Sequence, residues 1–281
     1  MAWGTVQGSA IVDTELFRKR RPVSDGRRLQ DNIVVVTGAS RGFGKLIALA
    51  AAEEGADVVV TYLTNKDKAE EVAGAIQKMG RRSAVHSCDI AKLDDVRRLA
   101  AAVWKQFGRC DVLINNAGET AASKTSWRDL REDVIDHILD MDIKGTMLCT
   151  HEFGQRMLDE QKAGNIVNIG SNVISTGSPR APEYAAAKYG ILGLTKSYAL
   201  ALAPYVRVNY AGPGFMDTDT LKQRKDFTPA RRKFLVDNTP LRAIGDPQNL
   251  VPVVMFLASE DSLHMTGNVV MCDGGFSMPG A

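Results

Sequence analysis

The stretch NIVVVTGASRGFGKLIALAAAEE, residues 32–54, decides the fold. Its apolar and β-branched residues 33–37 predict a short buried strand, and the apolar spacing over residues 46–50 predicts a helix. Three glycines separate the two elements: Gly38, Gly42 and Gly44. A strand, a glycine-rich turn and a helix in this order can hold the pyrophosphate of a dinucleotide, because the glycines let the phosphates approach and the helix N-terminus attracts the anion.

Two other interpretations of this turn stay open. The glycine spacing differs from the common G-x-G-x-x-G pattern, and glycines also close many ordinary βα turns. The segment Gly38–Gly42 also fits G-x-S-x-G, the nucleophile elbow of α/β hydrolases, with Ser40 as the nucleophile. An elbow normally follows several strands, whereas only a polar arm precedes this first strand, so the hydrolase interpretation is disfavoured.

The composition is that of one globular α/β domain. The 281 residues are 44% hydrophobic and 24% charged, with a net charge of +2, which argues against a dedicated nucleic-acid binder. No apolar run is long enough to span a membrane, and the first residues lack the apolar core of a secretory signal. The sequence therefore predicts no nucleic-acid partner and no membrane association.

Four cysteines are spread widely along the chain: Cys88, Cys110, Cys149 and Cys272. No two of them form a CxxC pair, so their spacing suits neither a zinc site nor a disulfide framework. We expect free thiols, no metal, and a reducing, cytoplasmic location.

Residues 1–30 differ in character from the rest of the chain. They contain six basic and three acidic residues with little periodicity. The favoured interpretation is a flexible or interface-packed arm; a transit peptide and a basic tail for a polyanion are weaker alternatives. Residues 31–281 are expected to form a single domain.

Strand and helix patterns alternate from residue 32 onward. Expected strands and helices are listed in chain order: strand 33–37, strand 57–62, helix 66–79, strand 83–87, helix 93–107, strand 112–115, helix 132–158 in one or two pieces, strand 165–169, helix 183–203, strand 206–210, helix 247–257 and strand 269–271. Strands separated by helices predict βαβ units and a parallel sheet covered by helices on both faces.

Three residues after the predicted fourth and fifth strands suggest proton transfer. Ser171 follows the fifth strand, and Tyr184 and Lys188 lie four residues apart at the start of one helix, hence on the same face. A nearby ammonium stabilises a phenolate, and a serine hydroxyl can orient a carbonyl. Each residue alone is weak evidence, but their order behind a glycine turn is informative.

From about Asp31 to Ser277 the chain resembles the short-chain dehydrogenase/reductase family, and its 3-oxoacyl-carrier-protein reductase-like branch in particular. The resemblance rests on motifs that occur in the family's order: Thr37-Gly38-x-x-x-Gly42-x-Gly44, Asp89-Ile90, Asn115-Asn116-Ala117-Gly118, Ser171, Tyr184-x-x-x-Lys188, Asn209, Pro213-Gly214 with Thr218, and Asp273-Gly274-Gly275. It implies a single Rossmann-type doubly wound domain with a seven-stranded parallel sheet, a small-molecule carbonyl or alcohol substrate, and a homotetramer or homodimer.

The resemblance also implies roles for individual residues. Tyr184 would be the acid/base, Ser171 would hydrogen-bond the substrate oxygen, and Lys188 would bind the nicotinamide ribose and stabilise the Tyr184 phenolate. Asp89 and Ile90 would contact the adenine, and Thr218 the carboxamide. The full set of expected cofactor-binding residues is Gly38, Ser40, Arg41, Gly42, Phe43, Gly44, Tyr62, Asn65, Asp89, Ile90, Asn116, Ala117, Gly118, Tyr184, Lys188, Pro213, Gly214, Met216 and Thr218.

The end of the second strand predicts NADP(H) rather than NAD(H). An NAD enzyme usually has an acid there, which binds the ribose 2′-hydroxyl. Tyr62 occupies this place, and Arg41 in the glycine turn could pair with a 2′-phosphate, with Ser40, Asn65 and Lys66 as further donors. The alternative is that Arg41 points into solvent.

One position departs from the family pattern. Asp142 stands where the family has an asparagine that helps to hold a water in the proton relay to the lysine. A carboxylate near Lys188 would compete for its ammonium, so we expect an active enzyme whose alcohol oxidation is optimal at higher pH. This departure is the only support for a different class of function, a catalytically weak nucleotide-binding regulatory or scaffolding protein.

The substrate is not identified by the sequence. The segment 221–235, which covers the substrate in the family, contains six basic residues and one acid. One interpretation is a solvated basic lid. The more specific interpretation is that the basic residues bind an anionic substrate or form a docking patch for a carrier protein.

Overall fold

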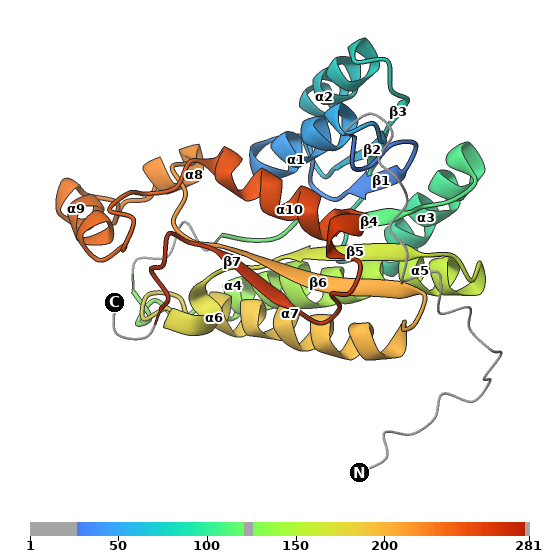
Figure 1. The fold of residues 1–281 in the computed structure, drawn as a ribbon. Coiled ribbons are helices and arrows are strands. Elements are labelled where there is room, and N and C mark those ends of the chain that lie inside the picture. The colour runs from blue at the N-terminus through green and yellow to red at the C-terminus, as the bar shows by residue number, and fades with distance from the viewer. Residues whose placement is uncertain (1–26, 121–125, 279–281) are drawn as a thin grey trace.

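Seven parallel strands form the centre of the computed structural model, which describes residues 27–120 and 126–278 (Figure 1). The strands are β1 (Ile33–Val36), β2 (Asp57–Tyr62), β3 (Ser83–Ser87), β4 (Val112–Asn115), β5 (Gly164–Ile169), β6 (Val206–Pro213) and β7 (Val269–Cys272). They lie in the order β3-β2-β1-β4-β5-β6-β7. The order reverses between β1 and β4, and this switch point is where doubly wound sheets bind ligands.

Helices cover both faces of the sheet (Figure 1). One face carries α1 (Gly42–Glu53), α2 (Lys66–Lys78) and α10 (Val251–Ala258). The other carries α3 (Leu93–Phe107), α5 (Gly145–Asp159) and α7 (Pro182–Ala201), with α4 (Glu132–Leu139) packed on α7. The short helices α6 (Val173–Thr176), α8 (Asp219–Lys222), α9 (Pro229–Asp237), η3 (Pro247–Leu250) and η4 (Glu260–Ser262) complete the described chain.

The strand β1 shows why the chain forms a two-sided core. Val34 and Val36 pack with Ile47 of α1 on one face, whereas Val35 packs with Leu113 on the other. All four residues of β1 are buried, as expected for a parallel strand between two helical layers. The predicted fold class, a doubly wound seven-stranded parallel sheet, is confirmed.

Several elements differ from the sequence prediction; the predicted helix 247–257, for example, is the 3₁₀ turn η3 followed by α10, and the predicted helix 183–203 is α7. The strand β6 continues through Pro213, where the sequence suggested an end at Tyr210. The predicted helix 132–158 is continuous, but its middle is the π-helical turn η2 (Asp140–Lys144) between α4 and α5. A π turn often marks a functional site, and this one carries Asp142.

Most of the predicted N-terminal arm, residues 1–26, lies outside the described residues. Its last part packs against the domain: Leu29 is fully buried, and its backbone N–H donates to the Glu54 carbonyl at 3.0 Å. The Arg28 side chain forms an ion pair with Glu54. In the described ranges no helix combines the length and apolar composition that crossing a bilayer requires.

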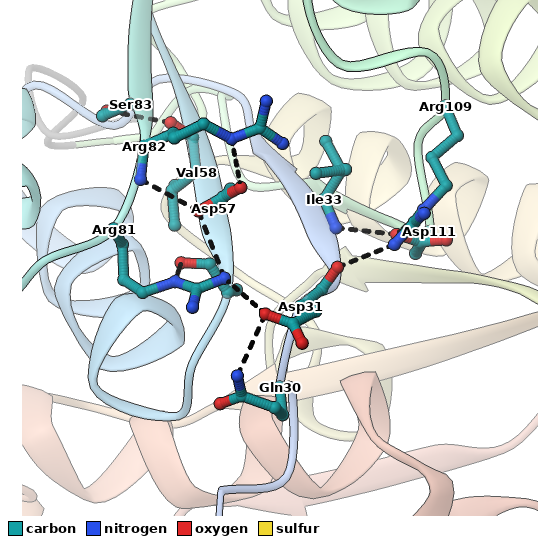
Figure 2. A network of polar contacts seen from close by, with 11 residues as sticks. Gln30, Asp31, Ile33, Asp57, Val58, Arg81, Arg82, Ser83, Arg109 and Asp111 are labelled. Carbon is teal, nitrogen blue, oxygen red and sulfur yellow. Dashed lines mark hydrogen bonds and ion pairs between the residues drawn. The ribbon is translucent and has the colours of Figure 1, made fainter.

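A network of charged residues ties the amino ends of the strands together, at the edge of the sheet away from the glycine turn (Figure 2). Asp57 is its centre: its carboxylate accepts from the Arg82 backbone N–H at 2.9 Å and from Arg82 Nε at 2.6 Å. Arg81 Nη2 lies 3.2 Å from Asp57 Oδ1 and 3.1 Å from Asp31 Oδ1. The network joins the segment before β1 to β2 and to the start of β3.

Replacing Asp57 with alanine should lower the free energy of unfolding by about 2 kcal/mol, because the nearly buried carboxylate satisfies a backbone N–H and two guanidinium groups. Denaturant unfolding of wild type and Asp57→Ala measures this. Glu71→Ala, which removes an exposed carboxylate from α2, is the control and should change the free energy by less than about 0.5 kcal/mol. Equal stability of the two variants would show that the network does not stabilise the fold.

Candidate active site

The glycine turn between β1 and α1 adopts a backbone that requires glycine. Gly38 and Gly42 have positive φ values of 65° and 57°. A Cβ on Gly44 would lie 2.3 Å from the Gly38 carbonyl oxygen, so a side chain there would clash with the turn itself. A Cβ on Gly42 would meet nothing within 4 Å, which leaves open space beside the first turn of α1. This cradle fits a phosphate group at a helix N-terminus.

The chain after β4 holds the glycine turn from the other side. Asn116 Nδ2 donates to the Thr37 carbonyl at 2.9 Å and to the Gly38 carbonyl at 3.2 Å. The backbone N–H groups of Asn116 and Ala117 both donate to Thr37 Oγ1 at 2.9 Å. The predicted Asn116 therefore fixes the geometry of the turn as well as lining the cleft described next.

A cleft of about 640 Å³ opens at the carboxyl ends of β1 and β4. Most of the predicted cofactor-binding residues line it: Gly38, Ser40, Arg41, Gly42, Phe43, Asn65, Asn116, Ala117, Gly118, Tyr184, Gly214, Met216 and Thr218. The sequence analysis missed further lining residues, including Leu63, Lys68, Met141 and Arg224. The predicted donor Lys66 is not among the lining residues; it is paired with Glu70, and Lys68 lines the cleft in its place.

Six predicted cofactor residues are not among those that line the cleft. They are Gly44, Tyr62, Asp89, Ile90, Lys188 and Pro213. Asp89 accepts from the Ala91 backbone at 3.1 Å and pairs with Lys92, and Ile90 packs against Gly145. The adenine contacts expected of Asp89 and Ile90 stay predictions.

The three residues with expected roles in proton transfer come from β5 and α7. Ser171 follows β5, and α7 begins with Pro182 in its first turn. Tyr184 and Lys188 lie four residues apart on α7 and therefore share one face. Lys188 Nζ lies 5.4 Å from the centre of the Tyr184 ring. Tyr184 lines the cleft, whereas Lys188 is 5% exposed beneath it.

Asp142 completes this group from the π turn η2. Its side chain is fully buried, and Oδ2 lies 2.8 Å from Lys188 Nζ. Its other oxygen, Oδ1, accepts from the Glu119 backbone N–H at 2.7 Å. A Cβ on Gly118 would lie 2.4 Å from this oxygen, so the predicted Gly118 makes room for the carboxylate. Burial lowers the pKa of Lys188, but the charge and hydrogen bond of Asp142, together with Tyr184 and Tyr210, outweigh burial and the pKa is raised.

Tyr210 of β6 is a residue that the sequence analysis missed. Its hydroxyl donates to the Ser171 carbonyl at 2.9 Å and accepts from the Ser171 backbone N–H at 2.7 Å. Burial raises the pKa of Tyr210, so the hydroxyl keeps the proton that it donates. A Cβ on Gly170 would lie 1.8 Å from the Tyr210 ring, so the glycine before Ser171 admits this side chain. The signal available in the sequence was a tyrosine, Tyr210, in the strand that pairs with β5, the strand before Ser171.

Removing the Tyr210 hydroxyl should displace Ser171, because both backbone groups that it satisfies are buried. We expect Tyr210→Phe to lower the free energy of unfolding by about 1–3 kcal/mol, measured by denaturant unfolding. The control is Tyr198→Phe, which removes a hydroxyl that donates to the Met147 carbonyl near the other end of α7. Equal stability of wild type and Tyr210→Phe would contradict a positioning role for the Tyr210 hydroxyl.

Comparison with known proteins decides the family. The family model described as Enoyl-(Acyl carrier protein) reductase matches residues 38–277. The chain belongs to the short-chain dehydrogenase/reductase family. The predicted resemblance is therefore confirmed, and the chain is an oxidoreductase by family, from a family whose members use a nicotinamide cofactor.

Three relatives of this short-chain dehydrogenase/reductase show how close the similarity is. The 3-oxoacyl-[acyl-carrier-protein] reductase FabG of Staphylococcus epidermidis is 37% identical over 245 residues, which cover 87% of this chain and 98% of that protein. A short-chain type dehydrogenase/reductase from Mycobacterium marinum has a TM-score of 0.82 at 30% identity, over 91% of this chain and 99% of that one. A gluconate 5-dehydrogenase from Burkholderia cenocepacia, solved with NADP and tartrate, has a TM-score of 0.83 at 26% identity, over 90% and 98%.

Proposed function

We propose that the protein is an NADP(H)-dependent oxidoreductase that interconverts a carbonyl compound and a secondary alcohol, with Tyr184 as the acid/base. The observation that carries the proposal is the placement of Tyr184 on the cleft that also contains the glycine turn, with the buried Lys188 ammonium beside it. When bound, NADP(H) supplies or accepts the hydride. The protein orients the substrate and moves the proton.

Each residue of the group has a separate task in this proposal. In the reducing direction Tyr184 Oη donates a proton to the substrate oxygen, and the Ser171 hydroxyl donates a hydrogen bond to the same atom. Lys188, whose pKa is raised as described, stays an ammonium and stabilises the phenolate that Tyr184 becomes. Asp142 orients Lys188 and partly neutralises its positive charge.

The experiment that tests this function is a turnover panel read by NADPH absorbance. The panel contains 3-oxoacyl thioesters, as the name of the FabG relatives suggests, together with sugar acids, steroid ketones and small aliphatic ketones. We expect reduction of at least one class with NADPH. A protein that binds NADPH but turns over none of them, in either direction, would favour the regulatory alternative, which the comparisons do not support.

Arg41 supports NADP(H) over NAD(H). Its side chain is exposed on the cleft, beside Ser40 and near Asn65 and Lys68, so several donors face the place expected for the ribose 2′-phosphate. Tyr62 ends β2 where NAD enzymes have an acid. The solved neighbours do not discriminate between the two cofactors, because one was solved with NADP and a 7α-hydroxysteroid dehydrogenase was solved with NADH.

Replacing Arg41 with alanine should lower kcat/KM for NADPH about 10- to 100-fold, the contribution of one or two charge-assisted hydrogen bonds, and leave the value for NADH within about threefold. Lys45→Ala is the control, because it removes an exposed positive charge one turn further along α1. An unchanged NADPH/NADH ratio in Arg41→Ala would remove the main support for NADP(H).

Further observations support the oligomeric state and the cellular location that we propose. Exposed apolar side chains on α5 and α7, Met147, Tyr189 and Leu200, support a homodimer or homotetramer. The four free cysteines support a reducing, cytoplasmic location. We propose a small-molecule substrate and neither a nucleic-acid nor a membrane partner.

A further inference from the structure

Two arginines from distant parts of the chain share one carboxylate at the cleft. Arg224 holds Asp226 with both ends of its fork, Nε to Oδ1 at 2.9 Å and Nη2 to Oδ2 at 2.5 Å. Arg180 Nε lies 3.4 Å from Asp226 Oδ2. The two arginine side chains are only 15% and 14% exposed, so they are held in place rather than extended into solvent. We call these three residues the Arg180–Asp226–Arg224 cluster.

The cluster contains more positive than negative charge. Two guanidinium groups face one carboxylate, whose pKa is lowered chiefly by its hydrogen bonds from Arg224, so the carboxylate is ionised at neutral pH. Burial and the charge of Arg224 lower the pKa of Arg180, and Arg231 of α9 lowers it further. Since arginine keeps its proton in proteins, the three side chains of the cluster together carry one net positive charge. Such a site favours a bound anion.

The cluster lies beside the proposed acid/base. Arg224 and Tyr184 line the same cleft. Arg180 precedes Tyr184 by four residues, and an ionised Tyr184 acts on the pKa of Arg180 in the direction opposite to that of burial. Of the cluster, Arg224 is the member that lines this cleft, so a substrate that contacts Tyr184 shares the cleft with the Arg224 side chain.

We infer that the Arg180–Asp226–Arg224 cluster recognises an anionic group, a carboxylate or a phosphate, that the substrate carries within a few bonds of its reacting carbon. Arg224 Nε and Nη2 hold Asp226, which leaves the Nη1 hydrogens and the second Nη2 hydrogen to donate to such oxygens. Asp226 keeps both guanidinium groups in a fixed orientation. The inference rests on the proposed function and narrows it to charged carbonyl substrates such as oxo acids and phosphorylated ketones.

The competing explanation is that the cluster only latches the segment around α8 to the loop before α7. In that case Asp226 matters as much as either arginine. In the anion-binding case Asp226 is the one member whose charge opposes the ligand. The variant Asp226→Asn, which keeps the size of the side chain and removes its charge, separates the two explanations.

The test uses pairs of substrates that differ in charge alone: short oxo acids, with the carboxylate two to five bonds from the ketone, and their methyl esters. Arg180→Gln and Arg224→Gln should each lower the acid-to-ester ratio of kcat/KM about 10- to 100-fold, as expected for lost charge-assisted hydrogen bonds. Lys225→Gln, an exposed neighbour, is the control and should leave the ratio within about twofold. A dihydroxyacetone phosphate arm shows whether phosphate is preferred to carboxylate.

Asp226→Asn should keep or raise the acid-to-ester ratio. If Asp226→Asn lowers the ratio as much as Arg180→Gln does, the cluster is a latch and the inference is wrong. The inference is also overturned if the arginine variants affect only thioesters attached to an acidic carrier protein, because that result assigns the arginines to protein docking.

A separate readout distinguishes failure of this inference from failure of the proposed function. NADPH fluorescence measures cofactor binding, and turnover of the neutral esters measures hydride transfer without the anion. If the wild-type protein binds NADPH and reduces esters as well as acids, the proposed function is supported and the anion-binding inference is contradicted. The wild-type protein could instead reduce neither substrate while its NADPH fluorescence still responds to malonate in an Arg180-dependent way. That result supports the anion site and contradicts the proposed function.

Discussion

Tyr184→Phe is expected to lower kcat by about 10³-fold while the protein still binds NADPH with a Kd within about twofold of the wild-type value. A general acid that is lost from a positioned site costs 10² to 10⁴ in rate, and the substrate oxygen of this site has no other side chain with a proton of suitable acidity in the proposed arrangement. The ring itself stays, so the cleft wall and its packing are preserved. Steady-state turnover and NADPH fluorescence measure the two quantities.

Tyr189→Phe is the matched control for this variant. Tyr189 lies on the same helix, five residues further along, but its side chain is 48% exposed and does not line the cleft. Its kcat should equal that of the wild type within about twofold. If Tyr184→Phe kept more than a tenth of the wild-type kcat, Tyr184 would not be the acid/base and the proposed mechanism would fail.

The alternation of the sequence was enough to predict the sheet. The segments 57–62, 83–87, 93–107 and 112–115 form elements with the predicted bounds, because each is a short pattern with a clear start and end. The glycine turn was also predictable from the sequence. Gly38 and Gly42 adopt positive φ values, which favour glycine, and they stand between a strand pattern and a helix pattern.

The π turn was not predictable from the sequence, because apolar spacing continues across residues 132–158 and one extra residue per turn leaves no compositional mark. Side-chain orientation is a second limit. The sequence placed Asp142 near the relay, but only the tertiary structure shows its carboxylate 2.8 Å from Lys188. The contacts of Tyr210 with Ser171 and of Arg180 with Asp226 join residues about 40 positions apart, so local patterns could not reveal them.

Asp142→Asn is expected to move the rising, acidic limb of the pH profile for alcohol oxidation toward lower pH by about one unit, which corresponds to about 1.4 kcal/mol, because Tyr184 accepts the proton in this direction. The wild-type carboxylate partly neutralises the Lys188 ammonium, whose pKa is raised, so Lys188 stays charged across the assay range. Without the carboxylate, the full ammonium charge acts on the phenolate and stabilises it. The pH dependence of kcat for oxidation measures this shift.

The same variant should also lose stability, by about 2 kcal/mol, because it leaves a buried ammonium without its counter-charge. The loss stays below the 3–5 kcal/mol typical of a broken buried pair, since the asparagine oxygen can still accept from the Glu119 backbone N–H. Asp140→Asn is the matched control: this aspartate lies on the same π turn, half-exposed, and pairs with Lys144 at the surface. It should change neither the profile nor the stability.

Two results would contradict this account of Asp142. An unchanged profile would mean that the charge of Asp142 does not reach Tyr184 through Lys188, although the ion pair is 2.8 Å long. An inactive Asp142→Asn protein that still binds NADPH would mean that burial, which lowers the pKa of Lys188, removes its proton once the carboxylate is gone. In that case Asp142 would act by keeping Lys188 charged, and the family's asparagine could not substitute for it in this chain.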